Sequence, residues 1–325
     1  MHPPEFWNTD GVTPALLSPL GALYGWSVRV RQARAHPFRP KACVVCVGNL
    51  TAGGTGKTPV AIALAHALAA RGLKTAFLSR GYGGRCAGPL QIDPAHHAAH
   101  DVGDEPLLLA AHGLTIVSRD RARGAKLADF LGADIIVMDD GFQNFQIAKD
   151  ISLVVVDAAT GFGNGRLIPA GPLREPVAQG LARADCLVLM GDGAPALPAF
   201  AGAILHAHIV PSAPDALSGR SVFAFAGIGR PQKFFDMLRA LDARVLATQS
   251  FPDHHRFNAT ELTALKQAAQ KTEALLVTTE KDFVRLDPIT RSDVVPVPVH
   301  AAFMGDAPFH ALLDRIAEAG KVSRA

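Results

Sequence analysis

The feature that most constrains this fold is a glycine-rich run that joins a β-branched segment to a helical pattern. Residues 44–47 read Val-Val-Cys-Val, which predicts a buried strand. The run GNLTAGGTGKT follows at residues 48–58, and the apolar residues after it recur at helical spacing. A flexible loop between a strand and a helix N-terminus can turn its backbone N–H groups toward an anion. This junction therefore predicts a P-loop that binds a nucleoside triphosphate.

The chemistry of the loop residues predicts their contacts. Lys57 would reach the β- and γ-phosphates, and the hydroxyl of Thr58 would ligate Mg²⁺. The strict pattern G-x-x-x-x-G-K-[ST] requires glycine at a position where this chain has threonine, but two glycines follow slightly later. We expect eight residues to hold the nucleotide: Thr51, Ala52, Gly53, Gly54, Thr55, Gly56, Lys57 and Thr58.

Two adjacent acids at the end of another predicted strand form a candidate metal site. Asp139 and Asp140 follow the sequence Ile-Ile-Val-Met. An isolated pair of this kind is more often a solvated turn, but acids at the carboxyl end of a parallel strand face the ligand crevice. Because a P-loop lies upstream, we expect both aspartates to hold Mg²⁺ together with Thr58.

The rest of the chain alternates short apolar strands with helical segments. Strands are expected at residues 75–78, 114–117, 134–138, 151–156 and 186–190. Strands that are apolar along their whole length indicate a parallel sheet covered on both faces. The sequence thus predicts an α/β protein with a P-loop NTPase-like, mostly parallel sheet domain over residues 36–200.

The composition changes at residues 191–200, where Gly, Ala and Pro dominate, and this stretch is interpreted as a linker. Beyond it, strands are expected at 222–225 and 274–277. Residues 294–299 form at best an edge strand, because two prolines interrupt them. Helices are expected at 232–241, 259–270 and 307–318. These elements predict a second, smaller α/β domain over residues 201–325.

Residues 1–35 are expected to form an N-terminal amphipathic, membrane-associating helix. Ser18 and Pro19 predict the helix start. No charged residue occurs between Asp10 and Arg29, but glycines and prolines argue against a membrane span. One face is expected to carry Leu20, Leu23, Tyr24 and Val28. Such a helix could lie in a membrane surface with the following arginines near anionic headgroups, or it could pack on the body of the protein.

Charge and cysteine content exclude some classes of protein. Lys and Arg number 32 against 29 Asp and Glu, a net charge of +3 that does not indicate nucleic-acid binding. Four cysteines in 325 residues do not make a disulfide scaffold. Cys43 and Cys46 lie three apart in a predicted strand, so they should point to opposite faces as buried thiols. Reduced thiols fit a cytoplasmic compartment, and no obligate protein partner is evident.

Three classes of P-loop protein compete: a small-molecule kinase, a GTPase, and a switch ATPase of the partitioning or metallochaperone type. A GTPase should carry Asn/Thr-Lys-x-Asp, but residues 279–282 read TEKD. Partitioning ATPases place a lysine just before the Gly-Gly pair, where this chain has Ala52. A metallochaperone needs metal ligands, and His96, His97 and His100 form a loose cluster that an exposed loop explains as well.

Seven short motifs, taken together, resemble those of one family. They are GNLTAGGTGKTP at 48–59, SRGYG at 79–83, VGDEP at 102–106, DDGFQ at 139–143, PLREP at 172–176, FPDHH at 251–255 and TTEKD at 278–282. With these, the chain resembles the tetraacyldisaccharide 4′-kinases, the lipid A kinases of Gram-negative bacteria, over nearly its whole length. The resemblance implies transfer of the ATP γ-phosphate to the 4′-hydroxyl of a tetraacyldisaccharide 1-phosphate, giving lipid IVA. It also implies ATP and Mg²⁺ as cofactors, a lipid A precursor as substrate, and a position at the cytoplasmic face of the inner membrane.

The resemblance also implies catalytic roles. A sugar hydroxyl is a poor nucleophile, so a carboxylate must orient it and accept its proton. In this family that acid corresponds to Asp104, and its partner to His254, although His255 is adjacent and could be the ring that acts. Asp104 could also cap a helix, which would not exclude catalysis. Arg174 and Glu175 match a pair placed near the substrate or the transferring phosphate.

Four further residues are expected to contact substrate: Tyr82, Asn49, Gln143 and Asn144. Lys57 completes the expected catalytic set. The family usually has histidine where this chain has Asn144. Asparagine can form hydrogen bonds but cannot become cationic at neutral pH, so any charge neutralisation by that histidine must be replaced here.

Overall fold

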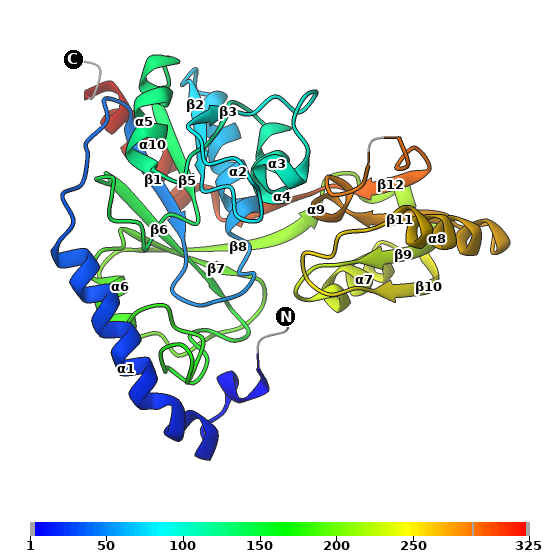
Figure 1. Cartoon of the computed structure of the whole chain (residues 1–325), viewed down its shortest axis with the longest axis horizontal. Helices are drawn as coiled ribbons and strands as arrows, with labels where there is room; N and C mark the ends of the chain where they lie inside the picture. The colour runs from blue at the N-terminus through cyan, green and yellow to red at the C-terminus, as the bar shows by residue number, and fades with distance from the viewer. Residues whose placement is uncertain (1–3, 288, 323–325) are drawn as a thin grey trace.

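The computed structural model describes residues 4–287 and 289–322 and shows two units side by side (Figure 1). The helices are η1 (Glu5–Asn8), α1 (Val12–Ala33), α2 (Lys57–Ala69), α3 (Ala99–Val102), α4 (Asp104–Ala110), α5 (Arg121–Phe130), α6 (Val177–Leu181), η2 (Pro214–Leu217), α7 (Pro231–Ala240), α8 (Ala259–Lys271), α9 (Glu280–Phe283) and α10 (Asp306–Val322). The strands are β1 (Cys43–Gly48), β2 (Thr75–Ser79), β3 (Leu90–Gln91), β4 (Thr115–Val117), β5 (Ile135–Asp139), β6 (Ile151–Asp157), β7 (Cys186–Met190), β8 (Ala203–Pro211), β9 (Ser221–Ala226), β10 (Arg244–Ser250), β11 (Leu275–Thr279), β12 (Val294–Val297) and β13 (Val299–Met304).

The large unit is built on a nine-stranded sheet with the order β13-β8-β7-β6-β1-β5-β2-β4-β3. β13 and β3 run antiparallel to their neighbours, and the remaining pairs are parallel. β1 lies between β5 and β6, where every one of its residues is buried. The predicted α/β class with a mostly parallel P-loop sheet is confirmed.

The two faces of this sheet carry separate cores. Cys43, Val45 and Val47 pack with residues of α2 and α10 on one face. Val44 and Cys46 pack with residues of α5 and of the loops after β5 and β6 on the other face. The two cysteines are therefore buried thiols on opposite faces, as their spacing predicted.

The small unit is a parallel four-stranded sheet with the order β10-β9-β11-β12. α7 contributes to the core on one face and α8 to the core on the other. β12 contains Pro296 and lies at the sheet edge, in agreement with the prediction. Asn258 caps α8 reciprocally with Glu261, which was also predicted.

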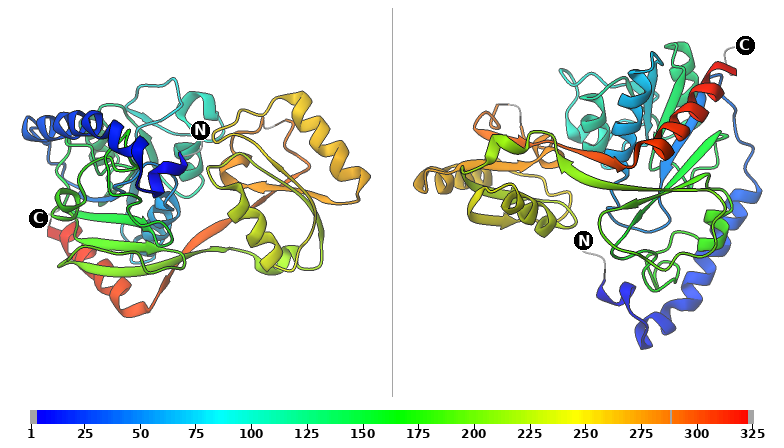
Figure 2. Two further views of the ribbon diagram at one scale, coloured as in Figure 1. Left: turned by 90° about the horizontal axis from the view of Figure 1, so that it is seen from below. Right: turned by 180° about the vertical axis from the view of Figure 1, so that it is seen from behind.

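The division between the two units differs from the boundary expected at residue 200. β8 pairs in parallel with β7, and β13 pairs antiparallel with β8, so both strands belong to the large sheet. α10 likewise packs in the core of the large unit. The chain leaves the large unit through β8 and returns through β13, and both views in Figure 2 show these green and orange-red segments linking the units. In β8 two histidines alternate with Leu205 and Ala207, which are buried, so the strand has a period-2 pattern and not the continuous apolar run of its neighbours.

α1 begins earlier than expected, because Val12 and not Pro19 opens its first turn. Ser18 is no cap: its hydroxyl donates to the carbonyl of Pro14 at 2.8 Å. The helix lies against the loop after β6 through small residues. A Cβ built on Gly21 would lie 3.0 Å from the Leu167 carbonyl oxygen, and one on Gly25 would lie 2.5 Å from Leu167 Cδ1, so the two glycines let the helix approach this loop closely.

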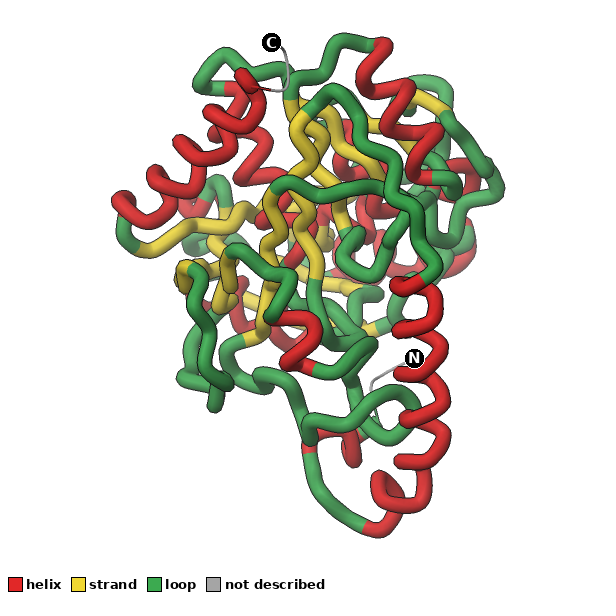
Figure 3. Tube along the Cα trace, turned by 90° about the vertical axis from the view of Figure 1, so that its left-hand side faces the viewer, coloured by secondary structure: helices red, strands yellow, loops and turns green. Residues whose placement is uncertain are grey.

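α1 runs along one side of the large unit (Figure 3). Its outer side is apolar. Its large exposed side chains are Val12, Leu16, Leu20, Leu23 and Trp26. The single face expected for Leu20, Leu23, Tyr24 and Val28 is therefore wrong, because the two leucines are exposed while Val28 is 3% exposed. Within residues 4–287 and 289–322, no helix combines the length and the apolarity that a membrane crossing would need.

Candidate active site

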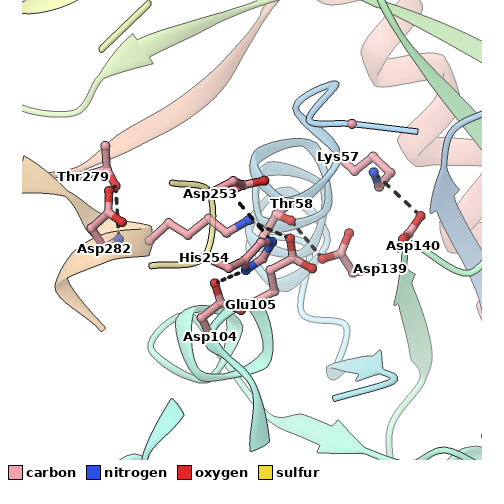
Figure 4. A network of polar contacts seen from close by, with 12 residues as sticks. Lys57, Thr58, Asp104, Glu105, Asp139, Asp140, Asp253, His254, Thr279 and Asp282 are labelled. Atoms are coloured by element: carbon pink, nitrogen blue, oxygen red, sulfur yellow. Dashed lines mark hydrogen bonds and ion pairs between the residues drawn. The ribbon is translucent and has the colours of Figure 1, made fainter. Parts of the chain in front are cut away.

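The P-loop connects the end of β1 to the first turn of α2. Gly56, the residue before the helix, has φ +88°, a left-handed conformation that favours glycine. Lys57 and Thr58 then point toward the two acids at the end of β5 (Figure 4). Lys57 Nζ lies 3.7 Å from Asp140 Oδ1, and the Thr58 hydroxyl donates to Asp139 Oδ2 at 2.9 Å. The four residues expected to act on phosphates and Mg²⁺ are thus adjacent.

The two acids have opposite electrostatics. Burial, followed by the nearby charges of Glu105 and Asp140, raises the pKa of Asp139 to about 7, although Lys57 and Thr58 oppose this shift. Burial also raises the pKa of Asp140, but the charges of Lys57 and Arg174 outweigh it and lower that pKa below its ordinary value. Asp140 therefore forms ion pairs with two cations, whereas among the described residues no ion pair reaches Asp139.

The site has the donors that Mg²⁺ prefers. Asp139 Oδ1 is buried and has no hydrogen-bond partner among the described residues. An orphaned carboxylate oxygen beside a threonine hydroxyl matches the hard oxygen ligands of a small divalent cation. The residues present therefore fit the metal.

Arg174 and Glu175 are adjacent in sequence but have different partners. Arg174 Nη1 donates to Asp140 Oδ1 at 2.7 Å, which places this guanidinium at the Walker-type acids. The Glu175 side chain is 1% exposed and pairs with Arg183 at 2.8 Å. It also accepts from Gln143 Nε2 at 2.9 Å. Arg174 therefore reaches the phosphate site, and Glu175 holds the surrounding loops.

The residues expected to contact substrate occupy different positions. Asn49 is fully buried and donates to the Thr55 hydroxyl at 3.3 Å, so it braces the P-loop from inside. Gln143 donates to the Asn49 carbonyl at 2.8 Å. The Asn144 side chain bonds with Gln146 at 3.0 and 3.2 Å, which forms a local turn. Within the described part of the chain, no hydrogen bond joins the Asn144 side chain to the phosphate-site residues.

Asp104 and His254 come from different units and meet beside the P-loop. Asp104 is the first residue of α4 in the large unit, and His254 lies in the loop after β10. His254 Nδ1 and Asp104 Oδ2 are 3.0 Å apart. His255 instead contacts Glu261 at 3.1 Å and stacks on Phe251. The structure thus brings His254, and not its neighbour, to Asp104.

Tyr82 lies at the open side of this pair. Its side chain is 70% exposed, and its ring meets the edge of the His254 ring at a centroid distance of 6.0 Å. An exposed aromatic ring beside a carboxylate–histidine pair can contact a sugar ring.

Three charged residues near Asp104 received no role from the sequence. Arg285 contacts Asp104 Oδ2 through Nε at 2.8 Å and also through Nη2. Lys281 pairs with Glu105 at 3.0 Å. Lys281 lies in the TTEKD motif, and Arg285 follows that motif by three residues. The motif therefore pointed to this segment, but only the fold shows that its partners are Asp104 and Glu105.

The surroundings of Asp104 keep it ionised. Burial is the largest single effect and raises the pKa of Asp104. The hydrogen bond with His254 and the charges of Arg285 and Lys281 together outweigh burial, so the pKa lies well below its ordinary range. Because an ionised carboxylate only accepts hydrogen bonds, the His254 Nδ1 atom carries the proton between them.

A second junction between the units lies at the end of β6. Asp157 is 4% exposed and accepts from Arg230 at 2.7 Å and from Lys233 at 3.2 Å. Both cations belong to the start of the small unit's α7. None of these three residues lies in a motif that the sequence patterns indicated.

A P-loop with paired acids, beside a carboxylate–histidine pair, is the arrangement of a P-loop phosphotransferase. A sequence model of the family described as tetraacyldisaccharide-1-P 4′-kinase matches residues 13–318, and the chain belongs to that family. The switch ATPase and metallochaperone alternatives are not favoured.

Individual relatives are similar over almost their entire length. The tetraacyldisaccharide 4′-kinase of Paramagnetospirillum magneticum is 51% identical over 321 residues, which cover 97% of this chain and 99% of the relative. That of Rhodospirillum rubrum is 50% identical over 325 residues, covering 97% and 98%. A crystal structure of the "apo" form of LpxK from Aquifex aeolicus in complex with ATP has a TM-score of 0.76 at 26% identity, covering 94% of this chain and 99% of that one.

Proposed function

We propose that this kinase transfers the γ-phosphate of ATP to the 4′-hydroxyl of a tetraacyldisaccharide 1-phosphate, which yields lipid IVA in lipid A biosynthesis. The observation that carries the proposal is the Asp104–His254 pair, which crosses between the units to stand beside the P-loop. The names of the relatives support the substrate, and the ATP held by the similar Aquifex aeolicus enzyme supports the nucleotide.

The phosphate site would hold the triphosphate with the P-loop residues 51–58. Lys57 and Arg174 supply positive charge to the transferring phosphate. Thr58, Asp139 and Asp140 would hold Mg²⁺, which when bound neutralises charge that develops on the phosphate oxygens.

The acceptor site would supply the base. The 4′-hydroxyl oxygen forms a bond to the γ-phosphorus as the bond between that phosphorus and the ADP oxygen breaks, and the hydroxyl proton passes to Asp104. His254 orients the carboxylate, and Tyr82 offers an exposed ring to the sugar.

The outer side of α1 would rest in the membrane surface. The exposed stripe of Val12, Leu16, Leu20, Leu23 and Trp26 can insert among acyl chains, while Arg29, Arg31 and Arg34 follow near anionic headgroups. We place this peripheral association at the cytoplasmic face of the inner membrane, where ATP is present. The acylated substrate would then reach the site without leaving the bilayer surface.

Phosphate transfer tests the function directly. The purified chain should convert ATP, Mg²⁺ and a tetraacyldisaccharide 1-phosphate into ADP and a lipid heavier by one phosphate, measured by mass spectrometry. Release of free phosphate with an unmodified lipid would contradict the proposal.

Vesicle sedimentation tests the membrane role of α1. Replacing Leu16, Leu20 and Leu23 by glutamine should weaken binding to anionic vesicles roughly a hundredfold, because three apolar side chains lose their lipid contact. A matched control replaces three exposed apolar residues elsewhere: Phe130, Leu246 and Ile289. Equal binding by both triple variants would show that α1 does not contact the membrane.

A further inference from the structure

Arg285 is a buried cation that crosses from the small unit to the large one. Only 5% of its side chain is exposed. It follows α9 of the small unit, yet its Nε and Nη2 atoms both contact Asp104 of the large unit. A guanidinium bound through two nitrogens fixes both distance and orientation, which a single ammonium contact does not.

All the recorded contacts of the Asp104 carboxylate fall on one of its oxygens. Oδ2 accepts from Arg285 and from His254 Nδ1 at 3.0 Å. Within the part of the chain that the structure describes, no hydrogen bond reaches Oδ1. Three contacts on one oxygen fix the rotation of the carboxylate and leave the other oxygen available to accept a proton.

Arg285 is itself held by groups of the small unit. Its Nη1 atom donates to Asp282 Oδ1 at 2.6 Å and to the Gly227 carbonyl at 2.8 Å. The same carbonyl accepts from the backbone N–H of His254 at 3.1 Å. Asp282, which is fully buried, accepts from the Gly227 N–H at 3.0 Å and from Thr279 at 2.7 Å. The guanidinium and the catalytic histidine are therefore fastened to one loop of the small unit.

We propose that Arg285 is a positioning residue of the kinase: it locks the Asp104 carboxylate so that Oδ1 faces the acceptor hydroxyl, and Asp282 and the Gly227 carbonyl hold it in register with His254. This inference rests on the proposed function, since it requires Asp104 to be the base. If Arg285 has this role, the Asp104 carboxylate is correctly oriented only when the small unit is docked on the large one. Arg285 itself touches neither nucleotide nor sugar in this assignment.

The electrostatics add a pH signature to this geometry. The charged and titratable groups facing Asp104 are Arg285, His254 and Lys281, with Glu105 next to it in the chain. Removing the Arg285 charge takes away one of the effects that lower the pKa of Asp104, so that pKa rises. The acid limb of the rate profile, which reports ionisation of the base, must then move to higher pH.

Steady-state kinetics of Arg285→Gln and Arg285→Lys test the assignment. We expect kcat to fall roughly tenfold to a hundredfold in Arg285→Gln, the scale of a misplaced catalytic group, with the KM for ATP unchanged. Arg285→Lys should recover only part of the loss, because an ammonium cannot bond Asp104 and Asp282 in the same fork geometry. Arg239→Gln, which removes an exposed arginine paired with Asp236, serves as the matched control and should match the wild type.

A double-mutant cycle with Asp104→Asn separates this inference from the proposed function. If Arg285 acts through Asp104, adding Arg285→Gln to Asp104→Asn should cost little further activity. A kcat loss without a shifted acid limb, or a full additional loss in the double variant, would overturn the positioning role. Unchanged activity in Asp104→Asn alone would instead overturn Asp104 as base. If Arg285→Gln does not fold, Asp282→Asn, which loosens the guanidinium but retains its charge, must lower kcat with the KM for ATP unchanged. The shift of the acid limb is expected only in the variant that removes the charge.

Discussion

The proposed phosphate site and the proposed acceptor site of this kinase are built in different ways. The phosphate site uses one continuous loop, residues 48–58, and the end of the strand beside it. The acceptor site joins Asp104 of one unit to His254 and Arg285 of the other, across 150 and 181 residues of sequence. The first site exists once the large sheet forms, whereas the second exists only when the two units dock.

The forces that fix the two sites also differ. Val47 of β1 lies opposite Asp139 of β5 in a buried parallel register, so the P-loop and its acids are set by sheet hydrogen bonds. The acceptor site depends on a few ion pairs between the units. A few ion pairs stabilise a site less cooperatively than a hydrogen-bonded sheet does. We therefore expect the acceptor site to be the more easily disturbed of the two.

Lys57→Ala should break the phosphate site alone. Loss of the cation beside the β- and γ-phosphates is expected to abolish turnover, a loss of roughly a thousandfold or more. Folding should change little, because Lys57 forms only a 3.7 Å ion pair with Asp140. Activity, ATP affinity and thermal unfolding measured on one preparation check this, and retained phosphorylation of the lipid would contradict it.

Asp104→Asn should break the acceptor site and leave the phosphate site intact. We expect kcat to fall roughly 10²–10⁴-fold, the usual effect of a lost general base. ATP should bind as in the wild type, because among the described residues no hydrogen bond or ion pair links the Asp104 side chain to the P-loop residues 51–58. Titration calorimetry with a nonhydrolysable ATP analogue measures the nucleotide affinity of the variant and of the wild type. Equal losses of kcat and of nucleotide affinity would show that the two sites are not separate.

The same contrast explains what the sequence could predict. The P-loop, the Asp139–Asp140 pair and most strands were predictable because each is a local pattern set by period and spacing. The start of α1 was not, because its first turns lie against the loop after β6, where Arg166 Nη1 donates to the Ser18 hydroxyl at 2.7 Å.

Pairing between strands that are distant in sequence accounts for the remaining differences between the predicted and the observed structure. β8 and β13 belong to the large sheet only because the chain returns to it after 87 residues of other structure, which no local pattern records. The partners of Arg285 and Asp157 could not be predicted for the same reason. Residue identity in a motif can indicate that Asp104 and His254 matter, but only the docked units show which oxygen and which ring meet.

Asp157→Asn should loosen the docking of the two units, because it removes an acid that pairs with two cations of the small unit. Burial raises the pKa of Asp157, but the charges of Arg230 and Lys233 outweigh it and lower that pKa. A lowered pKa stabilises the folded state above the unfolded pKa, near 4, and this contribution disappears as the pH falls through the folded value. We expect the variant to lose about 1 kcal/mol at pH 7, since both cations are partly exposed and solvent screens them, and progressively less below pH 4.

Kinetics of the same variant decide which site depends on docking. Loss of the Asp157 ion pairs should lower kcat several-fold, because Arg285 and His254 belong to the small unit that is loosened. The affinity for ATP at the P-loop should stay unchanged. Asp236→Asn, which removes an exposed pair within the small unit, is the control and should alter neither stability nor kcat. If Asp157→Asn weakened ATP binding while kcat stayed unchanged, the phosphate site, and not the acceptor site, would depend on docking of the small unit.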